Sequence, residues 1–170
     1  MEDILKNLLA RMKLSKMDFI RGLGIIEDRF VLSFKLEDEQ IDFEIETNFR
    51  VRNKNEILLS FNDLYLDNNR KEIGIRKYRS QTTIEKTYLH EQIEKLNGIL
   101  KNIKPSSIVT KSYGDVYILF RQKGIVLEIL NDTHLENACL YRLLYKKNEN
   151  ICSYECNIKN NQLVTNQINI

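Results

Sequence analysis

Apolar side chains near the start of the chain recur at three- and four-residue spacing. They form one stripe over about three helical turns and comprise Ile4, Leu5, Leu8, Leu9 and Met12. This spacing predicts an N-terminal helix. The pattern is lost in the following segment LSKMDFIRGLG, where Gly22 and Gly24 indicate a turn.

The hydrophobic period changes to two at residue 29. Apolar and polar residues alternate over 29–36 and again over 41–46, with the polar segment EDEQ between them. Alternation of this kind predicts a β-hairpin with one buried and one solvated face. Segments 49–52 and 57–61 predict a third and a fourth strand, and the basic segment EIGIRKY predicts a fifth.

The clearest helical pattern lies in the middle of the chain. Thr82 and Glu85 have the spacing of a capping box. Apolar residues then step by four, three, four and three through Leu89, Ile93, Leu96, Leu100 and Ile103. Because Pro105 follows directly, we expect an amphipathic helix over 83–103.

Strand alternation returns after this helix, and it resembles the first set of strands. Phe49-Arg50-Val51 corresponds to Tyr141-Arg142-Leu143, and Phe43 corresponds to Leu127. One interpretation is that 25–79 and 108–160 are repeats joined by the helix. The other is that two unrelated meanders align about as well.

The expected fold class is therefore α+β, in a single domain over residues 1–170. Two antiparallel β-meanders would pack around the central amphipathic helix, with the N-terminal helix beside them. The second meander is apolar on both faces, through Tyr117, Leu119, Val126, Leu130, Leu140 and Leu144. This indicates a cover on its outer face, for which a second copy of the chain in a homodimer is one candidate.

The composition is that of a globular protein, with 170 residues, 42% hydrophobic and 29% charged. The longest apolar run, Val116 to Phe120, is far shorter than the roughly 20 residues of a membrane helix. Glu2 and Asp3 stand where a secretory signal would be positively charged. We therefore expect a cytoplasmic protein with no membrane partner. Its abundance of Asn, Ile and Lys is typical of an AT-rich bacterial or phage gene.

No motif in the sequence indicates catalysis. The G-x-S-x-G turn and the G-x-x-x-x-G-K-[ST] loop are both absent, and no lysine has an acidic residue two positions before it. Only His90 and His134 could serve as histidine acid–base groups. We expect no enzyme activity, no catalytic residue and no cofactor.

A zinc site is the one metal hypothesis that the sequence allows. His134, Cys139, Cys152 and Cys156 fall within 23 residues, but they lack the close C-x2-C pair of typical zinc sites. Cys152 and Cys156 would also lie about 13 Å apart along one strand. We therefore expect free thiols and no metal, with zinc as the alternative.

Charge is distributed unevenly, although the net charge is only +2. Residues 27–46 hold eight acidic and two basic side chains, and residues 70–79 hold five basic and one acidic. The acidic segment could bind a basic protein surface or pair with Arg50 and Arg52 on the next strand. The candidate partner-binding residues are Glu37, Asp38, Glu39, Asp42, Glu44 and Glu46. The basic strand could instead bind nucleic acid through Arg70, Lys71, Arg76, Lys77, Tyr78 and Arg79.

Two runs carry a family resemblance. GDVYILFRQKGIVLEILNDTHLENACLYRLL has apolar alternation with a Gly-Asp turn, and DFEIETNFRVRNKNEILLSFNDLYL has "FR" in one strand before a D-x-Y end. Both resemble small uncharacterised bacterial domains linked to immunity proteins of polymorphic toxin systems. The resemblance implies an α+β protein that binds a toxin or defence effector and blocks it. We therefore expect a non-enzymatic inhibitor, of immunity or phage anti-defence type, with a nucleic-acid-binding module as the alternative.

Overall fold

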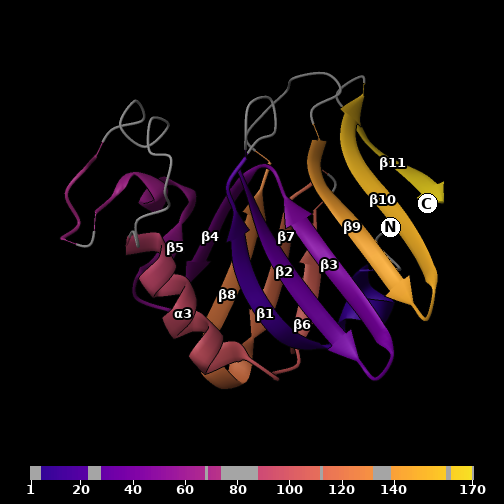
Figure 1. The fold of residues 1–170 in the computed structure, drawn as a ribbon, viewed down its shortest axis with the longest axis horizontal. Helices are drawn as coiled ribbons and strands as arrows, with labels where there is room; N and C mark the ends of the chain where they lie inside the picture. Colours follow the sequence, from indigo (N-terminus) through magenta and orange to yellow (C-terminus); the bar gives the residue numbers. More distant parts are fainter. Residues whose placement is uncertain are drawn as a thin grey trace.

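The computed structural model describes residues 5–22, 28–67, 69–73, 88–111, 113–131, 139–159 and 162–169. In these residues two antiparallel sheets lie one behind the other (Figure 1). Sheet A has the order β1 (Lys13–Ile20), β2 (Arg29–Leu36), β3 (Glu39–Ile45), β9 (Cys139–Lys147), β10 (Asn150–Lys159) and β11 (Gln162–Asn169). Sheet B has the order β5 (Ile57–Ser60), β4 (Asn48–Arg52), β8 (Ile125–Leu130), β7 (Val116–Phe120) and β6 (Ser107–Thr110).

The hydrophobic core lies between the inner faces of the two sheets. The ring of Phe30 on β2 stacks on that of Phe49 on β4, with centroids 4.7 Å apart, so these side chains join sheet A to sheet B. The alternating apolar residues of β2, β3, β7 and β8 are buried in this core: Leu32, Phe34, Ile41, Phe43, Ile45, Val116, Ile118, Phe120, Ile125, Leu127 and Ile129. The predicted period-two segments therefore each supply one face to the core.

The chain passes from sheet A to sheet B after β3 and returns after β8. The two passages lie together, because the Thr47 hydroxyl donates to the carbonyl of Leu130 (2.8 Å) and the Glu46 amide donates to that of Leu140 (3.1 Å). Each predicted meander is thus divided between the sheets, two strands in each. If every strand paired with its neighbour along the chain, each meander would form a sheet of its own. Instead, each sheet contains strands of both meanders.

The strands of the two halves of the chain occupy matching places in the two sheets. In sheet A the order β1-β2-β3-β9-β10 corresponds to β6-β7-β8-β4-β5 in sheet B. The registers agree as well: Phe34 pairs with Ile41 and Phe120 with Ile125, while Glu44 pairs with Arg142 and Glu128 with Arg50. Positions matched in this way are called equivalent below. That 25–79 and 108–160 arose by duplication stays a prediction.

The amphipathic helix lies at an edge and not between two meanders. The helix, α3 (Tyr88–Leu100), ends three residues before the predicted end at Ile103, where Asn102 has a φ of 65°. It packs against β1 and β5, the neighbouring edges of the two sheets (Figure 1). The Asn97 side-chain amide accepts from the Met17 amide (2.7 Å) and donates to its carbonyl (2.8 Å), so it satisfies backbone groups at the open edge of β1. In the predicted N-terminal helix, Leu5–Leu9 forms a single π-helical turn, η1, which packs against β6.

Three strands and three short helical turns complete the description. The sequence patterns did not predict β1, β6 or β11. The fourth predicted strand ends at Ser60 and continues as a 3-10 turn, η2 (Phe61–Tyr65), and another such turn, η3 (Arg121–Lys123), joins β7 to β8. Most of the predicted fifth strand, EIGIRKY, lies outside the described residues. No described helix is long and apolar enough to cross a membrane.

Candidate functional site

The predicted acidic partner-binding residues lie on or beside β3, and most of them already have basic partners. Lys147 pairs with Glu39 (2.6 Å) and Lys146 with Asp42 (3.1 Å). Arg142 lies 3.4 Å from Glu44 and 3.7 Å from Glu46. Glu37 and Asp38 are exposed in the turn between β2 and β3. The acidic surface available to a partner is therefore much smaller than the sequence indicates.

The predicted pairing of Asp42 and Glu44 with Arg50 and Arg52 is wrong. Both arginines are on β4 in sheet B, whereas Asp42 pairs with Lys146 of β9, and Glu44 pairs with Arg142 of β9 and Arg29 of β2. The reason is the passage between sheets after β3, which removes β4 from the neighbourhood of β3 and lets β9 take that place.

Asp42 and Glu44 are the two most buried of these acids, and Asp42 accepts hydrogen bonds from three side chains. Burial acts to raise its pKa, but hydrogen bonds from Ser33, Lys146 and Gln40 outweigh burial and hold the pKa below its ordinary value of 3.8. The carboxylate therefore stabilises the folded chain in its ionised form.

We expect the stabilisation of the folded chain by the ionised Asp42 carboxylate to be lost in acid. Since the folded pKa is lowered, the contribution is fully present above the unfolded pKa, near 4, and is lost as the pH falls through the folded pKa. Urea unfolding from pH 7 to pH 2 should show Asp42→Asn less stable than wild type at neutral pH, with the difference shrinking in acid. Ser33→Ala should move the loss to higher pH. A constant difference between wild type and Asp42→Asn would contradict this assignment.

The predicted nucleic-acid-binding residues are only partly described. Arg70 and Lys71 are exposed in a turn, and the Arg70 guanidinium lies 5.0 Å from the centre of the Tyr88 ring. Arg76, Lys77, Tyr78 and Arg79 lie outside the described residues. The structure therefore leaves this prediction as it stands.

Cys156 is buried, and Cys139 and Cys152 are half-buried. Burial raises the pKa of Cys139 to about 12 and that of Cys156 to about 11, so both thiols are protonated at neutral pH. No three potential metal ligands come together within the described part of the chain. His134 lies outside that part, so the zinc alternative is not tested.

The outer face of sheet B carries side chains that were not among the predicted site residues. Its residues form two cross-strand rows, each alternating with core residues on the same strands. Row one contains Ser60, Arg50, Glu128, Tyr117 and Val109, and row two contains Ile57, Arg52, Val126, Leu119 and Ser107. Ile57 and Val109 are 57% and 39% exposed and lie on the two edge strands, β5 and β6.

A carboxylate with two arginines lies in the middle of this face. The Arg50 and Arg52 guanidinium groups each donate from Nε to Glu128, whose side chain is only 2% exposed. Both arginines remain about 40% exposed. The face thus has a neutralised acid beneath two cations that can still contact solvent or a partner.

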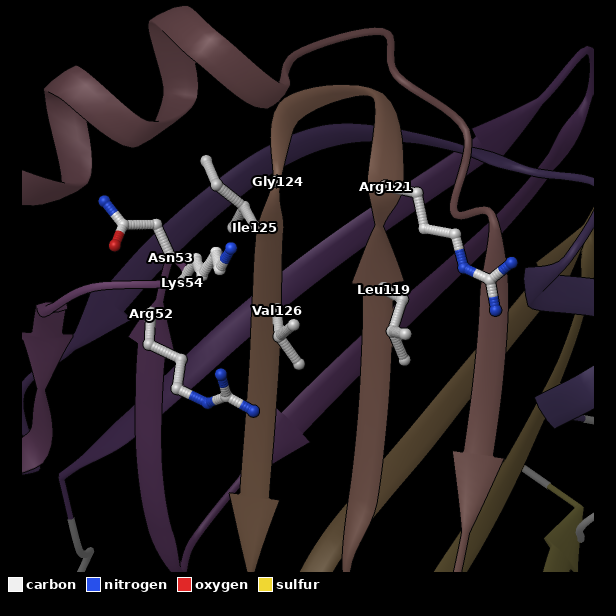
Figure 2. Close-up of a pocket in the computed structure, with 8 residues that line it drawn as sticks. All are labelled: Arg52, Asn53, Lys54, Leu119, Arg121, Gly124, Ile125 and Val126. Atoms are coloured by element: carbon white, nitrogen blue, oxygen red, sulfur yellow. The ribbon is translucent and has the colours of Figure 1, made fainter.

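A pocket of about 310 Å³ lies beside Arg52 at one end of the face (Figure 2). Leu119 and Val126 lie next to each other on neighbouring strands, and the side chains of Arg52 and Arg121 extend on opposite sides of them. Lys54, Asn53, Gly124 and Ile125 complete the lining. Gly124 has a φ of 64°, the left-handed conformation that ends η3 and lets the chain enter β8.

The equivalent face of sheet A differs in chemistry. Four apolar positions of sheet B correspond to polar ones in sheet A: Ile57 to Ser153, Val126 to Asp42, Leu119 to Ser33, and Val109 to Asp18. In one case the relation is reversed, since Arg52 corresponds to Leu144. Sheet A therefore has an outer face whose charges pair internally, whereas sheet B presents apolar side chains bordered by cations.

Comparison with protein-family models, with curated proteins and with solved structures gave no match. The resemblance to immunity-type domains therefore has no support or contradiction from relatives.

The sequence contains one signal for the face on sheet B. Tyr117, Leu119, Val126 and Leu130 alternate with core residues, so the second meander is apolar on both sides. This pattern predicts a cover on the outer face, whereas the charge pattern alone favours the acidic segment as the partner contact. The structure places these four residues on one sheet, all half-buried.

Proposed function

We propose that the protein is a non-enzymatic inhibitor that binds another protein through the outer face of sheet B. The observation that carries this proposal is the set of four apolar residues, Ile57, Val126, Leu119 and Val109, at positions where the equivalent face of sheet A is polar. Apolar side chains exposed on a sheet favour association because the association removes them from water. The inhibitory role, against a toxin or a defence effector, is what the resemblance to immunity-type domains implies.

The mechanism would be occlusion of the partner's working surface. A two-sheet framework with a buried core is rigid, so little conformational entropy is lost when its face docks. Tyr117 and the arginines Arg50 and Arg52 are of the residue types that contribute most at protein interfaces. The acidic segment is a weaker candidate surface, because a basic partner would have to displace Lys146, Lys147 and Arg142 from their carboxylates.

The test is affinity capture from the native host's lysate with a matched pair of variants. Ile57→Lys/Val109→Lys places two charges on the outer face of sheet B. Ile20→Lys/Ile99→Lys places two charges at equally exposed apolar positions elsewhere, 40% and 43% exposed. We expect wild type and the second variant to retain one protein in equal amount to themselves at high salt, and the first variant to lose it.

The captured protein should then be assayed with and without the inhibitor. Loss of its activity on addition of wild type, and not of Ile57→Lys/Val109→Lys, is the expected result. Two results would overturn the proposal. One is equal capture by both variants, and the other is recovery of nucleic acid alone, eluting as the salt concentration rises.

A further inference from the structure

Three cationic side chains surround the pocket at the end of sheet B, and two of them have no described acidic partner. Arg52 is held by Glu128. No carboxylate in the described part of the chain pairs with Lys54 or Arg121, and both residues are exposed. The pocket therefore has an excess of positive charge that Glu128 alone does not balance.

The floor of the same pocket is apolar. Leu119 and Val126 are half-buried and lie between the cations, and Ile125 adjoins them (Figure 2). A volume of about 310 Å³ is at the lower end of the range for ligand pockets. The pocket therefore suits a few side-chain groups better than a large cofactor.

We propose that this pocket binds an acidic segment of the partner protein, in which a carboxylate side chain adjoins a branched apolar side chain. This inference rests on the proposed function, since it names what the docked partner presents at one end of the face. Arginine presents a planar set of donors that matches a carboxylate, and Arg121 has that capacity unused among the described contacts. The apolar side chain would cover Leu119 and Val126 and exclude water from the ion pair, which strengthens it.

The lining favours this occupant over a nucleic acid strand. Single-stranded nucleic acid binds by stacking its bases on aromatic side chains along a basic groove. None of the residues that line the pocket is aromatic. Aliphatic floor residues match a peptide's leucine or isoleucine, so the cations are assigned to carboxylates and not to phosphates.

The test is an NMR titration of the full-length ¹⁵N-labelled chain with two peptides. One is acetyl-Leu-Glu-Ile-Asp-Leu-amide, and the other has Gln and Asn in place of the two acids. A free pentapeptide should bind with a Kd on the order of 1 mM, which such a titration detects. We expect the acidic peptide to shift the backbone resonances of Arg121, Gly124 and Val126, and the neutral peptide to leave them unchanged.

Two single substitutions in the 3-10 turn η3 allow a matched comparison of peptide binding. Arg121→Gln removes a cation that lines the pocket, and Lys123→Gln removes one from the same 3-10 turn that does not. The Kd for the acidic peptide should rise about three- to tenfold in Arg121→Gln and stay unchanged in Lys123→Gln. Equal effects of the two variants, equal binding of the two peptides, or shifts elsewhere on the chain would each overturn the inference. A titration with inorganic phosphate that reproduces the same shifts at lower concentration would also do so.

Failure of this inference is distinguishable from failure of the proposed function. If the peptides do not bind but Ile57→Lys/Val109→Lys still loses the captured protein, the outer face of sheet B binds a partner. The pocket then does not bind an acidic segment of that partner. If both variants capture equally and the peptide still binds, the pocket is an anion site unconnected with inhibition. The capture experiment therefore tests the outer face of sheet B, and the peptide titration tests the pocket.

Discussion

Replacing both Arg50 and Arg52 by methionine should lower the free energy of unfolding by about 3–5 kcal/mol. The two guanidinium groups are the described ion-pair partners of Glu128, whose carboxylate is 2% exposed in the centre of sheet B. Without them a negative charge would remain buried and uncompensated, and breaking a buried pair in this way costs about that much. Denaturation by urea at neutral pH, followed by circular dichroism, measures the loss.

A third substitution separates the charge effect from the loss of side-chain packing. In Arg50→Met/Arg52→Met/Glu128→Met no charge remains, and apolar replacement of a whole buried ion group is often neutral or stabilising. We expect its unfolding free energy to return to within about 1 kcal/mol of wild type. If the triple variant is as unstable as the double one, the arginine stems and not the buried carboxylate account for the loss. Arg50→Met alone should cost less, because Arg52 still neutralises the acid.

The strands with a core residue at every second position could be predicted from the sequence, and those that depart from this spacing could not. β2, β3, β7 and β8 each bury an apolar side chain at every second position, and the predicted segments match them. In β1 the register shifts between Leu14 and Lys16, so Leu14 and Met17 both face the core although they are three positions apart. This bulge removes the period of two, and the segment no longer resembles a strand.

The arrangement of the strands could be predicted only in part. The offsets of 84 between Phe43 and Leu127 and 92 between Arg50 and Arg142 correspond to matching positions in the two sheets. Alternation alone does not indicate that β3 and β4 belong to different sheets. Local pairing is the usual expectation for consecutive strands, and here it gave the wrong partners for Asp42 and Glu44.

The candidate site could likewise be predicted only in part from the sequence. The apolar outer residues of β7 and β8 are visible in the sequence. That Ile57 and Arg52 form one row with Val126 and Leu119 depends on the pairing of Arg52 with Val126, 74 positions further along the chain. Charge runs are conspicuous along a chain, yet they say little about exposure, because the opposite charges can come from a distant strand. The acidic segment of 27–46 is such a case.

Phe30→Ala should destabilise the fold by about 3–5 kcal/mol, the usual cost of removing a buried aromatic ring. Phe30 is fully buried, and its ring contacts Phe19 (5.3 Å), Phe49 (4.7 Å) and Phe61 (6.0 Å between centroids). Phe19 belongs to sheet A, Phe49 to sheet B and Phe61 to the 3-10 turn η2. One ring thus joins three elements, and its loss should leave a cavity that none of them can fill alone. Chemical denaturation of the variant measures the effect.

A double-mutant cycle shows whether this ring couples the two sheets. Phe30→Ala and Phe49→Ala should be non-additive by about 0.5–1.5 kcal/mol, as found for stacked aromatic pairs. Phe120 is equally buried but does not stack on Phe30 among the described ring contacts, so Phe30→Ala and Phe120→Ala should be additive. Additivity of the first pair would mean that each sheet is stabilised separately. In that case the rigidity on which the proposed docking face depends would have to come from the hydrogen bonds at the chain's two passages between the sheets, where Thr47 contacts Leu130.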